Sequence, residues 1–257
     1  MKKLYQKSEL AFAIVFIVAY CVIMSIGDSI SETVGITDAV TLPFAAVLSA
    51  VLTVFLKKNG LFEKYGLCKP KVKASAMLYY VPAAVLLTAN LLYGTAMNLS
   101  LTETVLYILT MFFVGFLEEI IFRGLLFGAM LKDNVKAAII VSSVTFGIGH
   151  IIRLFNGSGA ELFENILQVI YAIAAGFMFV MIYYKSKSLI CCIVTHGLFN
   201  ALSVFSNEAA ISVGKRIFSC IFLVSVSGFY ALYLFLSMKK QKSEDSSDGI
   251  VYESAEK

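Results

Sequence analysis

The fold is decided by residues 103–131, which read ETVLYILTMFFVGFLEEIIFRGLLFGAML. This apolar stretch is longer than the ~20 residues with which an α-helix crosses the ~30 Å hydrocarbon core of a bilayer. Its middle nevertheless holds the adjacent acids Glu118 and Glu119 and, shortly after them, Arg123. An ionisable side chain near the bilayer centre costs at least ~2.5–3.5 kcal/mol, so such residues indicate a functional site by default.

Apolar stretches surround this one on both sides. The whole chain is 59% hydrophobic and 15% charged, whereas a soluble domain carries about 25% charged residues. We therefore expect an all-α polytopic membrane protein, an eight-transmembrane-helix bundle that forms a single domain over residues 1–238. A polar tail, residues 239–257, follows and is expected to be disordered. The other seven predicted spans are roughly 10–27, 39–56, 75–94, 135–152, 164–184, 188–205 and 212–238.

The basic residues predict the orientation of this bundle. With the N-terminus in the cytoplasm, most Lys and Arg fall in cytoplasmic segments, and the outer loops hold only Arg153, Lys215 and Arg216. This bias follows the positive-inside rule and puts both termini in the cytoplasm. The net charge of +4 is small and dispersed, so no nucleic-acid partner is indicated. The expected location is a cell membrane.

The charged residues of the fourth span fall on two faces of a helix. Glu119 and Arg123 are four apart, so they share a face and can neutralise each other. Glu118 is rotated by about 100° and stays available for another role. The alternative is that all three residues form a structural ion network between helices. Gly124 and Gly128 follow with a GxxxG spacing, a weak signal for the close approach of a neighbouring helix.

His150 lies near the end of the fifth predicted span. Asp133 and Asn134 provide the turn between spans four and five, and Asn134 lies 16 residues from both Glu118 and His150. In an antiparallel hairpin, Glu118 and His150 therefore lie at the same depth, ~24 Å from the turn. The alternative is a helix-terminal histidine at the outer surface.

His196 and Asn200 form a third polar pair, in the seventh predicted span. They are four apart and point the same way. Counted from Lys187, His196 lies only ~13 Å into the span, shallower than Glu118 and His150. The sequence does not explain this difference in depth. The alternative for the pair is a structural role, in which both side chains form hydrogen bonds between helices.

Together these residues suit hydrolysis of a peptide bond. A buried carboxylate can act as a general base towards water, and imidazole and amide groups can stabilise the tetrahedral oxyanion. The candidate catalytic residues are Glu118, His150, His196 and Asn200.

The order and spacing of these motifs resemble those of one family. Glu118-Glu119-x-x-x-Arg123, Phe146-x-x-x-His150 and His196-x-x-x-Asn200 are similar to the three motifs of the CPBP (CAAX protease and bacteriocin-processing, or Abi) family, over a core of about 103–205. The resemblance implies an eight-helix intramembrane endopeptidase. It implies that Glu118 activates water and that His150 assists or binds a metal. It implies that His196 and Asn200 stabilise the oxyanion or complete a metal site, and that Glu119 and Arg123 support the first motif.

The cofactor stays open at this point. Two His and one Glu form a recognised catalytic zinc set, so Glu118, His150 and His196 would be the ligands of a Zn²⁺ ion. The family has been described both as metalloproteases and as metal-independent glutamate proteases. We favour the reading without an obligatory metal.

The partner is expected to be a membrane-associated peptide or a protein C-terminus. The small size of the chain and its Lys- and Ile-rich composition look bacterial. A bacterial origin favours a plasma-membrane location, and it favours bacteriocin self-immunity or peptide maturation over the processing of prenylated substrates. One alternative is a non-catalytic membrane scaffold or immunity protein. A transporter is a third possibility, but it would fit better with internal repeats and broken helices, which the sequence does not show.

Overall fold

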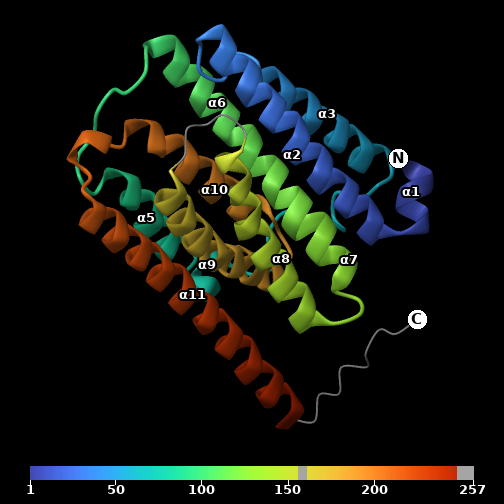
Figure 1. Cartoon of the computed structure of the whole chain (residues 1–257). Coiled ribbons are helices and arrows are strands. Elements are labelled where there is room, and N and C mark those ends of the chain that lie inside the picture. Colours follow the sequence, from blue (N-terminus) through green and yellow to red (C-terminus); the bar gives the residue numbers. More distant parts are fainter. Residues whose placement is uncertain (156–160, 248–257) are drawn as a thin grey trace.

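The computed structural model describes residues 1–155 and 161–247, and this part of the chain is helical, without strands (Figure 1). The long helices are α2 (Glu9–Val34), α3 (Thr41–Lys58), α6 (Leu101–Glu118), α8 (Val135–Gly149), α9 (Leu162–Ser186), α10 (Ile190–Leu202) and α11 (Val213–Ser247). The short ones are α1 (Lys2–Lys7), α4 (Ala74–Met77), α5 (Tyr80–Thr88) and α7 (Gly128–Met130). Single 3₁₀ turns follow α5, α8 and α10, and a fourth precedes α11, at Ala89–Leu91, His150–Leu154, Ser203–Phe205 and Glu208–Ala210.

Six helical segments of the described chain are long and apolar enough to cross a membrane. The expectation of an all-α membrane protein is therefore confirmed, whereas the count of eight spans is not. Predicted spans 75–94 and 188–205 correspond to the shorter apolar helices Tyr80–Leu91 and Ile190–Phe205. The second of these begins beneath the loop 59–73, where Leu189 N–H donates to the Gly66 carbonyl at 2.8 Å. Because that loop covers its start, the helix does not have to reach the surface.

Side-chain caps set several of the helix boundaries. The Ser8 hydroxyl accepts a hydrogen bond from Ala11 N–H at the start of α2. Ser100 and Glu103 form a reciprocal capping box at the start of α6, which satisfies amide groups that have no partner within the helix. Asn134 caps α8 by accepting from Ala137 N–H at 3.0 Å. The predicted turn between the fourth and fifth spans is thus present.

The fourth predicted span is one continuous helix of changing pitch. A π-helical segment, Glu119–Phe127, joins α6 to α7, and every one of its residues is buried. The sequence pattern predicted an ordinary α-helix here and gave no sign of a π-helical segment. Wide helical turns of this kind are rare and frequently mark functional sites.

The connections gather at two ends of the bundle. The lysine-rich end consists of the N-terminus and the loops 59–73, 131–134 and 187–189, which are tied by Lys64 and Lys132 to Glu9 at 2.7 and 2.9 Å. The lysine-poor end consists of the loops 35–40, 92–100 and 203–212. There Thr37 N–H donates to Glu103, and Ala96 N–H donates to the Phe205 carbonyl.

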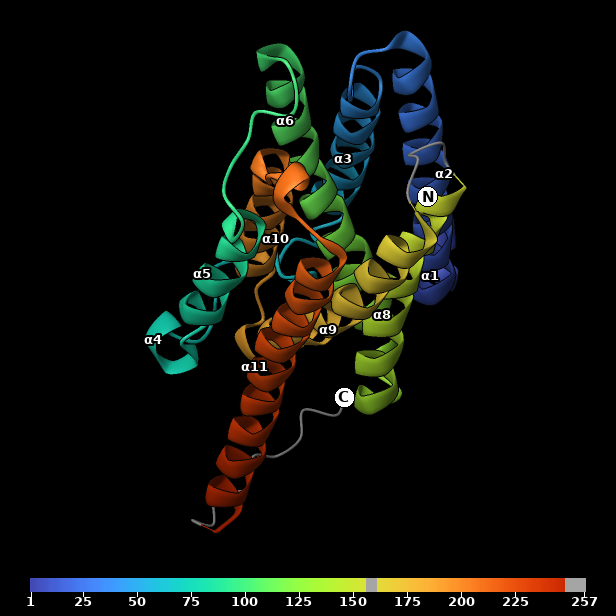
Figure 2. The same cartoon turned by 60° about the vertical axis from the view of Figure 1, so that its left-hand side comes forward.

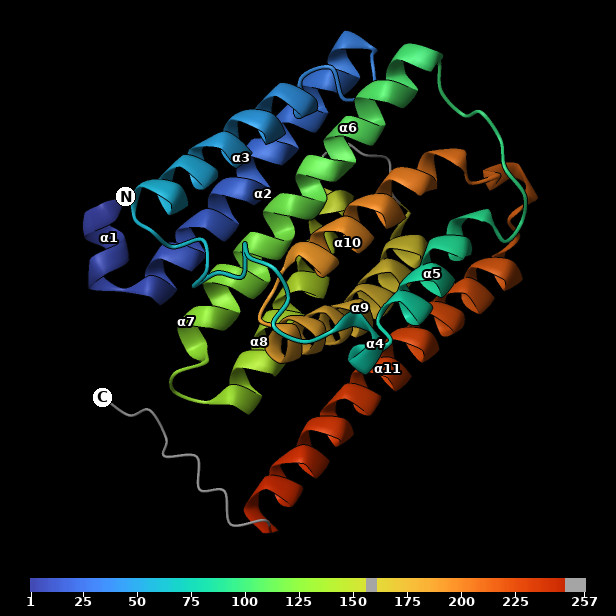
Figure 3. The ribbon, with the colours of Figure 1, turned by 180° about the vertical axis from the view of Figure 1, so that it is seen from behind.

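Helices α6 and α10 lie in the middle of the bundle, with α2 and α3 on one side and α5 and α11 on the other (Figure 3). Glycines allow neighbouring helices of the bundle to touch. A Cβ atom on Gly115 would lie 2.8 Å from the Gly197 nitrogen, and one on Gly176 would lie 2.9 Å from the Ser143 oxygen. The predicted GxxxG pair serves a different neighbour, because Gly124 and Gly128 both face the side chain of Tyr65 in the loop 59–73.

Helix α11 runs beyond the bundle at the lysine-rich end (Figure 2). It continues to Ser247, so residues 239–247 of the tail that was expected to be disordered are helical. The rest of that tail, 248–257, lies outside the described residues.

Candidate active site

Glu118 occupies the junction at which α6 gives way to the π-helical segment. Its side chain lines a cavity of about 740 Å³, and the residue is only 8% exposed. The Tyr20 hydroxyl, from the middle of α2, donates a hydrogen bond of 2.7 Å to Glu118 Oε1. This bond fixes one carboxylate oxygen and leaves Oε2 without an aligned hydrogen-bond donor among the described residues.

Glu119 points away from that cavity into the packed bundle. It is fully buried, as is Arg123, whose Nη1 lies 3.1 Å from Glu119 Oε1. The guanidinium group also lies 3.9 Å from the ring centroid of Phe146 and 5.5 Å from that of Phe179. Its nitrogens make no aligned hydrogen bond to the described residues. The buried cation is therefore balanced by the charge of one carboxylate and by two aromatic faces.

His196 contacts both acids. Its Nδ1 lies 2.8 Å from Glu119 Oε1, and its Nε2 lies 3.4 Å from Glu118 Oε2. A carboxylate oxygen only accepts, so Nδ1 carries the hydrogen of the shorter contact. The ring stacks on Phe179 at a centroid distance of 5.5 Å. Glu119 and Phe179 thus orient the imidazole so that Nε2 faces Glu118.

The depth of His196 resolves the mismatch left by the sequence. The depth predicted from the sequence assumed that Lys187 lies at the membrane surface. The next two residues, Ser188 and Leu189, are however fully buried. The Ser188 hydroxyl donates to the Cys68 carbonyl at 2.6 Å, so the loop 59–73 covers the turn. Helix α10 therefore starts inside the bundle and brings His196 level with Glu118.

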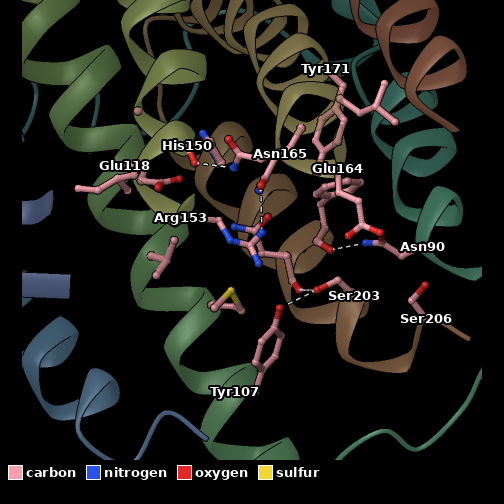
Figure 4. Close-up of a pocket in the computed structure, with 18 of the residues that line it drawn as sticks. Asn90, Tyr107, Glu118, His150, Arg153, Glu164, Asn165, Tyr171, Ser203 and Ser206 are labelled. Carbon is pink, nitrogen blue, oxygen red and sulfur yellow. Dashed lines mark hydrogen bonds between the residues drawn. The ribbon is translucent and has the colours of Figure 1, made fainter. Parts of the chain in front are cut away.

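His150 stands at the junction of α8 with its 3₁₀ turn. Its Nδ1 lies 3.1 Å from the Phe146 carbonyl, which only accepts, so Nδ1 carries the hydrogen and Nε2 is left as an acceptor. Asn165, from α9, donates to the His150 carbonyl at 2.9 Å. Figure 4 shows Glu118 and His150 at the same pocket, with Asn165 beside the histidine.

Asn200 lies one turn beyond His196 on α10 and lines the same cavity as Glu118 and His150. A smaller adjoining hollow is lined by both imidazoles and Asn200. The structure thus gathers the four candidate catalytic residues around connected space, while Glu119 and Arg123 lie behind His196.

The cavity leads from this group to the lysine-poor end. Its deep part is lined by Glu118, Phe122 and Phe146, and its outer part by Asp38, Glu208 and Arg216. Among the described residues, none from the loops of the lysine-rich end lines it. The described lining of the cavity therefore extends from the catalytic candidates towards the lysine-poor end.

The candidate zinc ligands do not form a metal-binding set as they are arranged here. The described residues include no group of three or more His, Cys, Asp and Glu side chains placed to share one ion. Both imidazoles pack against the ring of Phe146, with centroids 5.2 and 5.6 Å from it. Glu118, His150 and His196 thus do not fit a shared Zn²⁺ ion in this arrangement.

Two supporting residues, Tyr20 and Phe179, were not predicted from the sequence. Tyr20 lies in the first predicted span, in which the sequence showed only an apolar pattern. A tyrosine in mid-span, which needs a polar partner when buried, was the available signal. Phe179 carried no such signal, because its role depends on the packing of α9 against α10.

Comparison with known proteins agrees with the motifs. Residues 100–202 match the family model described as type II CAAX prenyl endopeptidase Rce1-like. This match confirms the family resemblance seen in the motifs, and it covers all four catalytic candidates. Tyr20 and the other cavity residues from α2 and α3 lie outside it. No curated protein and no solved structure shows significant similarity to the chain.

Proposed function

We propose that this membrane protein, whose residues 100–202 match the Rce1-like family of CAAX proteases, is an intramembrane endopeptidase that uses a glutamate-activated water. One observation carries the proposal. Glu118 is the acid of the first motif that faces the cavity, and it meets there the histidines and the amide of the other two motifs. Its neighbour Glu119 is sealed behind it.

The chemistry follows from the hydrogen-bonding capacity of each group. Water enters the cavity and gives one proton to Glu118, while its other hydrogen is accepted by His150 Nε2. The hydroxide attacks the carbonyl carbon of the substrate, and the amide of Asn200 donates to the oxyanion. Protonated Glu118 then delivers its proton to the leaving nitrogen as the C–N bond breaks. Atoms and protons balance without a further reactant.

The remaining polar residues position this machinery. Tyr20 holds one oxygen of Glu118, and His196 faces the other. Glu119 and Arg123 hold His196 in place. No step passes through a metal ion, since the donor side chains do not converge on one.

We further propose that the chain crosses the membrane eight times with both termini in the cytoplasm. The short helix α10 supports this, because it begins beside the loop 59–73 at the lysine-rich end and is followed by Ser206 at the lysine-poor end. The positive-inside rule places the lysine-rich end in the cytoplasm. The catalytic cavity then opens towards the outer face of the membrane.

An outward cavity favours substrates presented outside the cell. In a bacterial plasma membrane these would be secreted peptides or proteins, as in peptide maturation or self-immunity to a bacteriocin. Prenylated cytoplasmic proteins would approach the opposite, lysine-rich end of the bundle.

The test compares cells that carry the wild-type protein, Glu118→Gln or Glu32→Gln. Glu32 is an exposed acid near the end of α2 and serves as the control. Mass spectrometry of membrane and secreted peptides should show at least one uncut precursor that accumulates only with Glu118→Gln. Equal peptide profiles in all three strains, at equal protein levels, would instead favour a binding role.

A further inference from the structure

A second group of acidic side chains lies in the outer part of the catalytic cavity. Asp38, from the loop between α2 and α3, and Asp28, near the end of α2, both line it. The Thr41 hydroxyl donates to Asp28 Oδ1 at 2.9 Å, so the start of α3 lies against the end of α2. The mechanism proposed above uses neither carboxylate.

Asp38 does not serve as a helix cap. An aspartate just before a helix commonly accepts hydrogen bonds from the first amide groups. At the start of α3 that role belongs to Ser31, whose Oγ accepts from Val40 N–H at 3.0 Å and from Thr41 N–H at 3.2 Å. The carboxylate of Asp38 therefore does not cap α3, although its position just before the helix would allow it.

Asp38 is instead a buried carboxyl that lines the cavity. The residue is 8% exposed, and its Oδ2 accepts no hydrogen bond from the described residues. Burial, together with the nearby charge of Asp28, raises the pKa of Asp38 to about 7. Its backbone adopts a left-handed conformation, with φ of 60°, which aspartate tolerates better than most residues. Buried charged carboxylates in proteins are usually paired with a positive group.

The surroundings of Asp38 suit an organic cation better than a metal ion. The described residues here do not provide three carboxylate or imidazole side chains around one point. A single buried carboxylate with a second one beside it suits the ammonium or guanidinium of a peptide, which brings its own hydrogen-bond donors.

The helix geometry sets the distance between this acid pair and the catalytic group. Asp28 lies two turns or more along α2 from Tyr20, which holds Glu118. Eight residues of helix rise by ~12 Å, and an extended peptide covers ~3.3–3.6 Å per residue. The acid pair is therefore about three to four substrate residues from the reacting carbonyl.

We propose that Asp38, with Asp28 beside it, binds a positively charged group of the peptide substrate, about three to four residues from the bond that is cleaved. The inference rests on the proposed endopeptidase function and names its substrate class. The substrate is a peptide that carries a Lys or Arg, or a free N-terminal amine, in the part that projects towards the lysine-poor end.

The test uses N-acetylated octapeptides of alternating Ala and Leu, labelled with fluorescein at the C-terminus. One series carries a single Lys at successive positions, and a matched series carries Gln. A third set has a free N-terminus and no Lys, which separates a basic side chain from a terminal amine. Binding is measured with the full-length Glu118→Gln protein in detergent, so the result does not depend on cleavage.

At the best position the Lys or free-amine peptide should bind roughly tenfold more tightly than its neutral partner. Adding Asp38→Asn, which keeps the side-chain shape and the tolerance for positive φ, should abolish that preference. Adding Glu32→Gln, the matched loss of an exposed acid, should leave it unchanged. Equal binding of charged and neutral peptides, or a preference that survives Asp38→Asn, would overturn the proposal.

Cleavage of the same peptides by the wild-type protein then locates the subsite. Mass spectrometry should place the basic group three or four residues from the cut, and cleavage without that spacing would also count against the proposal. A protein that binds the Lys peptide through Asp38 but cleaves nothing would support the subsite and contradict the peptidase.

Discussion

The Nδ1 atom of His196 lies 2.8 Å from Oε1 of Glu119, an acid that does not reach the catalytic cavity. The same oxygen lies 3.1 Å from Arg123 Nη1. Glu119 therefore links a buried cation to the imidazole that faces Glu118. It does more than neutralise Arg123, the role that the sequence spacing suggested.

Replacing Glu119 should chiefly lower the stability of the folded protein. Glu119→Ala leaves Arg123 buried without its carboxylate, and breaking a buried ion pair in this way costs about 3–5 kcal/mol. We expect a marked drop in the thermal unfolding temperature in detergent, together with loss of peptide cleavage. The control is Glu161→Ala, an acid exposed at the start of α9. Wild-type stability of Glu119→Ala would show that Arg123 has another counter-charge.

Loss of the Tyr20 hydroxyl should impair catalysis more than folding. Tyr20→Phe removes the donor to Glu118 Oε1, and a hydrogen bond to a charged group is worth about 1.5–3 kcal/mol. We expect at least a tenfold fall in the cleavage rate, with the folded fraction in membranes preserved. Tyr171→Phe, on the same cavity wall, should have a much smaller effect. Equal cleavage rates for the two variants would show that the Tyr20 hydroxyl is not needed for catalysis.

The contact of α6 with α10 is set by glycine. A Cβ on Gly115 would meet the Gly197 backbone at 2.8 and 2.9 Å, so Gly115→Ala must push α10, and His196 with it, away from Glu118. Overpacking of this kind typically costs about 1–3 kcal/mol. We expect lower thermal stability and strongly reduced cleavage.

The matched control for that substitution is Gly228→Ala in α11, where an added Cβ meets nothing within 4 Å. This change should be neutral or should stabilise the helix by roughly 0.5–1 kcal/mol. If Gly115→Ala behaved like Gly228→Ala, the close approach of α6 and α10 would not be needed for the site.

Removal of metal should leave activity intact. Glu118, His150 and His196 do not form a shared ligand set, so purified protein dialysed against a strong chelator should cleave peptides at the untreated rate. Metal analysis of the same sample would verify that zinc has gone. Activity that disappears on chelation and returns on adding zinc would require a rearranged site.

The sequence predicted the elements whose positions depend on local rules. The hairpin turn at Asn134 and the helical spacing of Glu119 and Arg123 both follow from caps and periodicity. What could not be predicted depends on tertiary contacts. The depth of His196 is hidden by a buried turn at Ser188, and Tyr20 reaches Glu118 across 98 positions of the chain. Neither contact leaves a pattern along the sequence.

The central claim is that Glu118 activates the attacking water, and its most direct test is the cleavage rate of purified Glu118→Gln. The substrate is a peptide that the wild-type protein cuts, and the variant must show an unchanged unfolding temperature. Because the amide cannot accept the proton of water, the account predicts a rate at least ~10²–10⁴-fold below that of the wild type. A Glu118→Gln protein that cleaves within tenfold of the wild-type rate would contradict it.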